Sequence, residues 1–491
     1  MLSRCALVLL CCSAALSQES FEDRYRPRFH FSPKVNWTND PNGLVYFEGT
    51  YHLFFQHNPF GDTWGHMSWG HATSRDLLHW QEQPVAIPEE NGVMIFTGST
   101  VVDTNNTSGF CRGAHPCLVA IYTGHTPEDK TVETKPKPAL QTQNLAYSND
   151  AGLHWTKYTG NPVLDLHLSD FRDPKVFWST ASKQWIMLVS LPNDHKAQFY
   201  GSPDLKRWSQ LSEFGPAGAT GGQWECPELF ELPLDGNDSG KTRWVLKVGL
   251  NPGGLQGGSG EQYFVGQFDG RKFVNDNDPA LTLWTDYGKD CYCALTFNHL
   301  PPDQPQVMIG WMNNWQYANV VPTHPWRGQM TIPRQLSLKT YPEGVRLVQQ
   351  PVAAIETLRA GEATSGQVLE LLSTTDMGAA TEAGWRVLAD DGTYTLIGYD
   401  AKARQIFVDR TKSGDVSFSD KFPARTAAPF SAGSQLKLHV LIDRMSVEVF
   451  AGDGQIALTN LVFPTPTATK LEFYSEGGPI QKNTSTIWKL Q

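Results

Sequence analysis

The sequence carries little charge and has no cluster of basic residues. Only 18% of its 491 residues are charged, and 40 Lys and Arg face 50 Asp and Glu for a net charge of −10, whereas globular proteins average about a quarter. Runs or stripes of Lys and Arg are the features by which proteins hold nucleic-acid phosphates or an anionic membrane surface. We therefore expect neither a nucleic acid nor a membrane as a partner.

Long hydrophobic runs are absent after the N-terminus. Arg4 precedes a mainly apolar run over residues 6–16, and residues 15–17 (ALS) match a small-x-small cleavage site. These features predict a secretory signal peptide over residues 1–17. No later stretch reaches the roughly 18 apolar residues that a transmembrane helix needs, so we expect a soluble protein that is secreted to the extracellular space.

The cysteines form no metal-binding pattern. Cleavage after residue 17 would leave five of the eight, and an odd number leaves at least one thiol free or paired between chains. Cys111 and Cys117 bracket a short polar loop and are the expected disulfide, whereas the roles of Cys291 and Cys293 stay open. The histidines at positions 52, 57, 66, 71 and 79 would scatter over both faces of strands, and we expect neither metal nor cofactor.

A long helical period is also missing, and 43 Gly and 32 Pro make the chain rich in turns. Both features favour an all-β protein of short strands. A weak repeat supports this prediction: residues 74–80 (SRDLLHW), 148–155 (SNDAGLHW) and 202–208 (SPDLKRW) each follow a strand-like stretch. A Ser-x-Asp turn followed by a Trp returning to the core, repeated in this way, predicts propeller blades. We predict a five-bladed β-propeller over residues 25–340.

The pattern changes after Arg334 to ordinary alternation of apolar and polar residues. Residues 436–443 (LKLHVLID) and 446–450 (SVEVF) read as strands, and Asp453-Gly454 is a turn signal after them. We predict a β-sandwich over residues 350–491, with a short linking helix at residues 352–358.

The first candidate functional cluster spans residues 36–46 (NWTNDPNGLVY). Pro41 is poorly suited to a central strand, which places Asp40 in a turn at the end of a strand, between Asn39 and Asn42. Amides that hydrogen-bond to a carboxylate favour its ionised form, as a nucleophile requires. An ordinary turn would use the same residue types.

A second cluster at residues 170–176 (DFRDPKV) repeats the Asp-Pro pair. Asp173 would occupy in another blade the place that Asp40 has in the first, with Arg172 beside it. The alternative is a surface ion pair between neighbouring residues.

The third cluster covers residues 223–229 (QWECPEL). Glu225 lies between Trp224 and Cys226, and an apolar setting favours the protonated form of a carboxyl group, which suits a general acid. Glu228 faces a more ordinary strand and is the weaker candidate.

Three carboxylates near one axis, one protonated and one ionised, describe a glycosidase. The 16 Trp, 15 Tyr and 25 Phe suit either large aromatic cores or the flat faces that bind sugars. The aromatic and amide candidates for such a pocket, each of which could instead be a core or rim residue, are Gln56, Trp64, Trp69, Phe96, Trp311 and Trp315.

Together the three clusters resemble glycoside hydrolase family 32, the family of invertases, levanases and exo-inulinases, from about Phe29 to the C-terminus. The likeness includes residues 51–56 (YHLFFQ), 96–99 (FTGS), 286–290 (DYGKD), 310–315 (GWMNNW) and 443–450 (DRMSVEVF). It implies a five-bladed propeller followed by a β-sandwich, in agreement with the repeat.

The resemblance also implies roles for individual residues. Asp40 would be the nucleophile, Glu225 the acid/base and Asp173 the transition-state stabiliser of a retaining, exo-acting β-fructofuranosidase that acts on levan, inulin or sucrose. Its fructose pocket would contain Asn39, Asn42, Gln56, Trp64, Phe96, Thr97, Arg172, Trp311 and Trp315. A fructosyltransferase with the same residues, or a non-catalytic fructan-binding propeller, are the alternatives.

The chain departs from the family pattern at a few positions. Thr38 stands where Met is usual and creates a glycosylation sequon at Asn36, and Thr97 replaces Ser but keeps the hydroxyl. Cys291 and Cys293 stand where Phe and Ala are common, which leaves the pocket wall there in doubt. Further sequons begin at Asn105, Asn106, Asn237 and Asn483.

Overall fold

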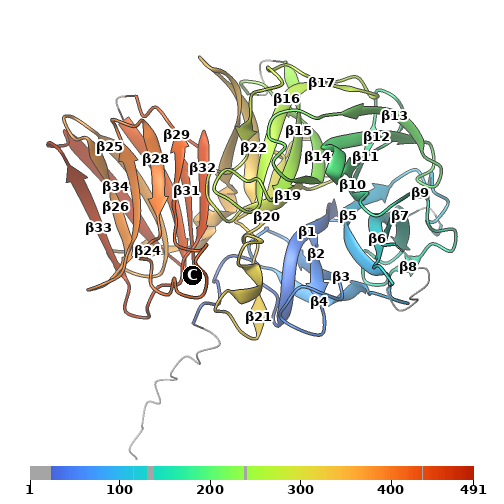
Figure 1. Cartoon of the computed structure of the whole chain (residues 1–491), viewed down its shortest axis with the longest axis horizontal. Helices are drawn as coiled ribbons and strands as arrows, with labels where there is room; N and C mark the ends of the chain where they lie inside the picture. The colour runs from blue at the N-terminus through green and yellow to red at the C-terminus, as the bar shows by residue number, and fades with distance from the viewer. Residues whose placement is uncertain (1–23, 114, 130–137, 237–239, 434) are drawn as a thin grey trace, which may run out of the picture.

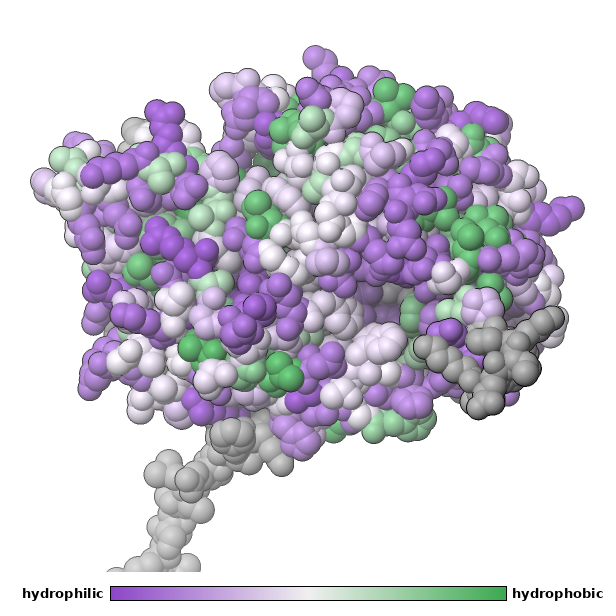
Figure 2. Space-filling model, viewed as in Figure 1, coloured by the Kyte–Doolittle hydropathy of each residue, from purple (hydrophilic) through white to green (hydrophobic). Residues whose placement is uncertain are grey.

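The structure is a computed structural model that describes residues 24–113, 115–129, 138–236, 240–433 and 435–491. The predicted signal peptide and the sequon residue Asn237 lie outside the described residues. Within them no helix has the length and hydrophobicity of a membrane span. Figure 2 shows that hydrophilic residues cover most of the face in view and that hydrophobic residues are scattered over it.

The described part of the chain from Asn36 to Pro351 forms five sheets around a common centre (Figure 1), which confirms the predicted propeller. The first sheet contains β1 (Asn36–Phe47), β2 (Thr50–Asn58), β3 (Ser68–Ser74) and β4 (Gln81–Ile87), with β21 (Trp326–Arg327) parallel to β1. The second contains β5 (Met94–Asp103), β6 (Cys117–Thr126), β7 (Leu140–Ser148), β8 (Thr156–Lys157) and β9 (Leu164–Leu168).

The remaining three sheets follow in chain order. The third contains β10 (Arg172–Ser179), β11 (Gln184–Leu191), β12 (Lys196–Ser202) and β13 (Ser209–Phe214). The fourth contains β14 (Gln223–Pro233), β15 (Thr242–Asn251), β16 (Gly260–Phe268), β17 (Phe273–Asn275) and β18 (Leu283–Trp284). The fifth contains β19 (Tyr292–Thr296), β20 (Val307–Trp311), β22 (Arg334–Tyr341) and β23 (Gly344–Pro351). The last strand of the propeller therefore ends at Pro351, beyond the predicted boundary at residue 340.

The repeated Ser-x-Asp turns occupy equivalent places in the first three blades, between the third and fourth strands. In each turn the Asp Oδ1 accepts a hydrogen bond from a backbone N–H three or four residues later, at 2.8 Å for Asp76, 2.9 Å for Asp150 and 2.9 Å for Asp204. The Trp that follows each turn packs against a buried cluster. The repeat is therefore a true signal of the blades.

The innermost strand of every blade is irregular close to its start. The pairing register breaks between Thr38 and Pro41 in β1, Ile95 and Gly98 in β5, Arg172 and Lys175 in β10, Glu225 and Glu228 in β14, and Tyr292 and Leu295 in β19. In three blades a proline, which has no N–H to donate to the ladder, accompanies the break: Pro174 and Pro227 lie inside it, and Pro41 directly follows it. Such bulges bend a strand and redirect its side chains.

The C-terminal part is a β-sandwich, which lies to the left of the propeller in Figure 1. The 3₁₀ helix η5 (Ala353–Leu358) links the two domains, where a short helix was expected; η2 (Pro192–Asp194) and η4 (Ala318–Val320) are further short 3₁₀ helices. One sheet contains β24 (Arg359–Glu362), β34 (Lys482–Leu490), β25 (Val368–Asp376), β30 (Gln435–Asp443), β31 (Ser446–Ala451) and β32 (Ile456–Leu461). The other contains β29 (Arg425–Pro429), β28 (Gln405–Asp409), β27 (Thr395–Asp400), β26 (Glu382–Ala389) and β33 (Lys470–Glu476).

Buried charges join the sandwich to the propeller. Arg334 of β22 donates to Asp286 Oδ2 at 2.9 Å and to Glu448 Oε1 of the sandwich at 2.7 Å. Asp286 also accepts the backbone N–H of Thr459 at 2.9 Å. All three charged side chains are nearly inaccessible to solvent. Removing one partner of such a pair typically costs about 3–5 kcal/mol, because the other charge is left buried.

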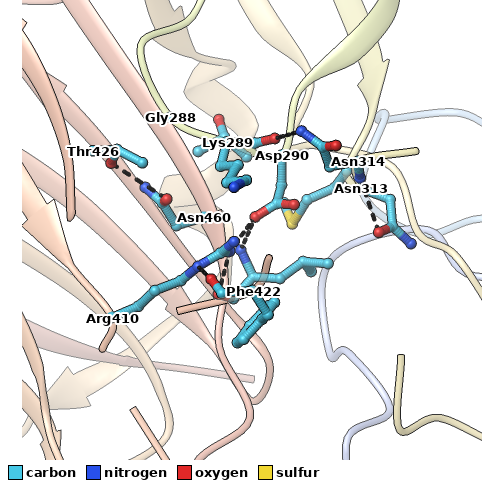
Figure 3. A network of polar contacts seen from close by, with 12 residues as sticks. Gly288, Lys289, Asp290, Asn313, Asn314, Arg410, Phe422, Thr426 and Asn460 are labelled. Atoms are coloured by element: carbon cyan, nitrogen blue, oxygen red, sulfur yellow. Dashed lines mark hydrogen bonds and ion pairs between the residues drawn. The ribbon is translucent and has the colours of Figure 1, made fainter. Parts of the chain in front are cut away.

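Asp290 makes a second connection of the same kind (Figure 3). Its carboxylate pairs with Arg410 of the sandwich and accepts the backbone N–H of Leu461 at 2.8 Å. Next to it, Asn314 donates to the carbonyl of Lys289 at 2.9 Å. The sequence stretches 286–290 and 443–450 therefore hold the two domains together.

His30 ties the N-terminal segment to the same interface. Its Nδ1 lies 2.9 Å from Asp443 Oδ2 and its Nε2 lies 2.7 Å from Glu448 Oε2. Burial alone would lower the pKa of His30, but hydrogen bonds to the two carboxylates outweigh it and raise that pKa to about 9. The imidazole is therefore held as a cation between two carboxylates at neutral pH.

We predict that this interaction makes stability fall at alkaline pH. A raised pKa means that the stabilisation is complete below the unfolded value of 6.5 and is lost as the pH rises through about 9. The shift corresponds to roughly 3 kcal/mol. The variant His30→Gln should melt at a lower temperature than the wild type near pH 6. This difference in melting temperature should become small by about pH 10, where His30 of the wild type has lost its proton.

His66→Gln is the matched control, because His66 pairs with Glu89 while its side chain is 60% exposed. The variant His66→Gln should have the melting temperature of the wild type at every pH. The prediction fails if His30→Gln keeps the alkaline decline of the wild type.

Candidate active site

A pocket of about 400 Å³ opens where the starts of the five innermost strands meet. Its volume lies in the range of small-molecule sites. Ten of the predicted site residues line it: Asn39, Asp40, Gln56, Trp64, Phe96, Thr97, Arg172, Asp173, Glu225 and Trp315. The bulges thus bring residues from five blades into one cavity.

Asp40 lies in the bulge of β1. Its Oδ2 accepts a hydrogen bond from the Thr97 hydroxyl at 2.8 Å, while Oδ1 has no partner among the described protein groups. Burial raises the pKa of Asp40 to about 6, against the hydrogen bonds from Thr97 and Asn39, and the charge of Glu225 raises it further. Burial therefore outweighs the stabilisation of ionised Asp40 that the sequence suggested.

Asp173 occupies the bulge of β10 with a φ of 67°, a conformation that is uncommon for a residue other than glycine. Its Oδ2 accepts the backbone N–H of Cys226 at 2.9 Å, and its own N–H donates to the Thr123 hydroxyl at 3.0 Å. Burial raises the pKa of Asp173 to about 7, although the charge of Arg172 opposes this. Asp173 is thus held from both neighbouring blades, by its carboxylate on one side and by its backbone N–H on the other.

Glu225 is held by two donors from other blades. Arg172 forms an ion pair with Oε1 at 2.8 Å, and the Tyr292 hydroxyl donates to Oε2. The predicted apolar setting is wrong. Trp224 and Cys226 are buried in two different hydrophobic clusters, while Glu225 lines the pocket.

The aromatic residues divide between the pocket and the core behind it. Trp64 is 42% exposed at the rim and packs edge-on against Phe96 at 6.1 Å. Trp315 lines the pocket and stacks on Trp37 with ring centroids 5.9 Å apart.

Three predicted pocket residues do not line it. Trp311 is fully buried behind Trp315, with ring centroids 4.8 Å apart, because it ends β20 beneath the pocket wall. Trp69 is fully buried and donates to the carbonyl of Phe96. Asn42 lies beyond the bulge, where β1 pairs again with β2, and its side chain is enclosed in the blade.

Five pocket residues were not predicted as site residues: His125, Gln141, Asp170, Asn251 and Tyr292. His125 stacks on Phe96 with ring centroids 4.5 Å apart. Gln141 accepts from the backbone N–H of Phe171 at 2.8 Å. His125 and Gln141 belong to strands without any motif, whereas Tyr292, between two cysteines, offered a signal.

Disulfides account for four of the described cysteines. Cys111 pairs with Cys117, as expected from the sequence, and Cys226 pairs with Cys293; Cys291 is buried and free. Atoms of Asp40, Cys226 and Cys293 lie within 4.8 Å of one another. The two sulfur atoms are bonded to each other, so they offer no thiolate, the form of cysteine that binds metals.

Comparisons with known proteins agree with this geometry. The family model "Glycosyl hydrolases family 32 N-terminal domain" matches residues 30–351, and "Glycosyl hydrolases family 32 C terminal" matches residues 343–489. A levanase of Bacillus subtilis is 43% identical over 511 residues, which cover 99% of this chain and 73% of the levanase. An extracellular exo-inulinase of Aspergillus niger is 43% identical over 516 residues, covering 96% of each protein.

Solved structures give the same result. The exo-inulinase of Aspergillus awamori superposes with a TM-score of 0.90 at 41% identity, covering 95% of this chain and 98% of that one. The β-fructofuranosidase of Schwanniomyces occidentalis, complexed with fructosyl-erythritol, has a TM-score of 0.85 at 34% identity over 96% of this chain and 98% of that one. With matching family models over nearly the whole described chain, a common fold and a carboxylate-lined central pocket, this chain belongs to glycosyl hydrolase family 32.

Proposed function

We propose that the protein is a secreted β-fructofuranosidase that releases terminal β-D-fructofuranose from levan, inulin and sucrose. The observation that carries this proposal is the meeting of Asp40, Asp173 and Glu225 in one pocket whose wall includes Trp64 and Phe96. Aromatic faces bind sugar rings and carboxylates bind their hydroxyls. The levanase and exo-inulinases that the chain resembles act on such substrates, as their names state.

The mechanism would be a double displacement. Glu225 protonates the leaving oxygen while Asp40 attacks the anomeric carbon, and Glu225 then takes a proton from the water that releases fructose. The hydrogen bond from Thr97 to Asp40 Oδ2 fixes the orientation of the attacking carboxylate. Arg172 and Tyr292 fix the direction of the Glu225 carboxyl group.

Asp173 would stabilise the transition state by accepting hydrogen bonds from fructose hydroxyls. Its Oδ2 is already held by the Cys226 N–H, so its second oxygen is the one available to sugar. A retaining enzyme keeps its two catalytic carboxyl groups about 5–5.5 Å apart. We therefore expect this spacing between the carboxyl groups of Asp40 and Glu225.

Secretion is supported by the pattern of residues 1–17 and by the extracellular exo-inulinases among the similar proteins. The sandwich would serve chiefly as a structural partner, since its signature residues Asp443 and Glu448 bind His30 and Arg334 at the domain interface.

We predict that Glu225→Gln lowers fructose release from sucrose, inulin and levan by about 10³-fold, as expected for loss of a general acid/base. Glu231→Gln is the control, because Glu231 is exposed on the same strand and does not line the pocket. Fructose is quantified in both variants and in the wild type, whose relative rates identify the preferred substrate.

Other outcomes of this assay would change the function. Oligosaccharide products instead of free fructose at high sucrose would identify a fructosyltransferase with the same site. A folded wild-type protein that acts on none of the three substrates would exclude catalysis on them and leave fructan binding.

We also predict that Thr97 sets the acidic limb of the pH profile. Asp40 must be ionised to attack, so kcat/KM should fall as the pH drops through about 6. The Thr97 hydroxyl stabilises the ionised form of Asp40, so Thr97→Val should raise the pKa of Asp40. The acidic decline of kcat/KM should then move to higher pH by about one pH unit. Thr97→Ser keeps the hydroxyl and should keep the wild-type limb. An unchanged limb in Thr97→Val would contradict the assignment of Asp40 as the titrating nucleophile.

A further inference from the structure

The Cys226–Cys293 disulfide joins the innermost strands of the fourth and fifth blades next to the pocket residues Glu225 and Tyr292. The two cysteines are 67 residues apart in the sequence, and their Cα atoms are 5.5 Å apart. Each directly follows a pocket residue, Glu225 or Tyr292, and each lies inside the break in strand register. The crosslink therefore connects the two bulges that present the acid/base and its tyrosine partner.

The disulfide also touches the other two carboxylates. The backbone N–H of Cys226 donates to Asp173 Oδ2 at 2.9 Å, and its sulfur lies 3.9 Å from Asp40 Oδ2. The Tyr292 hydroxyl, one residue before the other end of the crosslink, donates to Glu225. A displacement of either cysteine would thus disturb the placement of all three carboxylates.

Both cysteines have a backbone that needs support. Their φ angles are 48° for Cys226 and 44° for Cys293, in the left-handed region that residues other than glycine seldom adopt. Such conformations persist where the surrounding structure holds them in place. Inside a bulge the strand pairing is interrupted, so a covalent link supplies restraint where ladder hydrogen bonds are missing.

We infer that the Cys226–Cys293 disulfide is a positioning element for catalysis, which holds Glu225 and Tyr292 at the edges of their bulges so that the acid/base stays aligned with Asp40. This inference rests on the proposed function. Cys226 and Cys293 do not line the pocket and are positioning residues. Without the crosslink the two bulges relax independently, and Glu225 loses its alignment.

The effect should fall on kcat more than on KM. Much of the predicted sugar contact comes from the first two blades, through Asn39, Gln56, Trp64 and Phe96, which the disulfide does not join. Misplacement of a catalytic group by about 1 Å can cost on the order of 100-fold in rate. A purely structural crosslink would instead lower the melting temperature and leave kcat unchanged.

The chain contains a matched control. Cys111 and Cys117 form a disulfide that closes a loop of sequence separation 6 between β5 and β6. Neither residue lines the pocket. Removal of the Cys111–Cys117 disulfide should affect stability without affecting the alignment of Glu225.

The test compares Cys226→Ala/Cys293→Ala with Cys111→Ala/Cys117→Ala and wild type, using sucrose as substrate and circular dichroism to confirm folding. We expect the first variant to lose about 10- to 100-fold in kcat while KM stays within about threefold. The control variant should keep the wild-type kcat. The single variant Cys293→Ala, which leaves the smaller perturbation, should show the same loss of kcat if the double variant does not fold.

Two results would overturn the inference. One is a folded Cys226→Ala/Cys293→Ala enzyme with the kcat of the wild type; the other is a failure of both it and Cys293→Ala to fold, since the disulfide would then serve the fold itself. A wild-type protein that releases no fructose would refute the proposed function instead, which is a separate outcome.

Discussion

Every innermost strand of the propeller breaks its pairing close to its start, and the pocket depends on these five interruptions. A regular strand alternates its side chains between the two faces of a blade and would direct few of them toward the axis. The bulges in β1, β5, β10, β14 and β19 instead turn Asp40, Thr97, Asp173, Glu225 and Tyr292 toward one centre. The bulge prolines and the positive φ angle of Asp173 are local consequences of the same constraint.

Charge is buried in two places with opposite results. At the domain interface each buried charge has a partner of opposite sign: Arg334 meets Asp286 and Glu448, and Arg410 meets Asp290. In the pocket, three carboxylates have one nearby arginine, and burial together with the charges of neighbouring carboxylates raises the pKa values of Asp40 and Asp173 to about 6 and 7. The paired charges attach the sandwich to the propeller. The pocket carboxylates lack a full complement of positive charge and can therefore bind sugar hydroxyls and exchange protons.

Much of this could be predicted from the sequence, because the informative signals are local. The Ser-x-Asp turns identify the blades, and the Asp-Pro and Glu-Cys-Pro motifs identify the carboxylates, since proline within a strand implies a bulge or an edge. What failed depends on contacts between blades. Tertiary packing decides whether Trp311 or Trp315 faces the pocket. It also brings Glu225 to Arg172 and Tyr292, and it pairs Cys226 with a residue 67 positions away. The boundary at residue 340 was too early because β23, an outer strand, has the ordinary alternation of the sandwich strands.

The central claim is that Asp40 and Glu225 act as nucleophile and acid/base of a retaining fructosidase. Proton NMR during the first turnovers on sucrose, at an enzyme concentration high enough to outrun mutarotation, would identify the anomer that leaves the enzyme. Two displacements at the anomeric carbon predict β-fructofuranose as the first product. Initial release of the α anomer would mean a single displacement by water and would contradict the role assigned to Asp40.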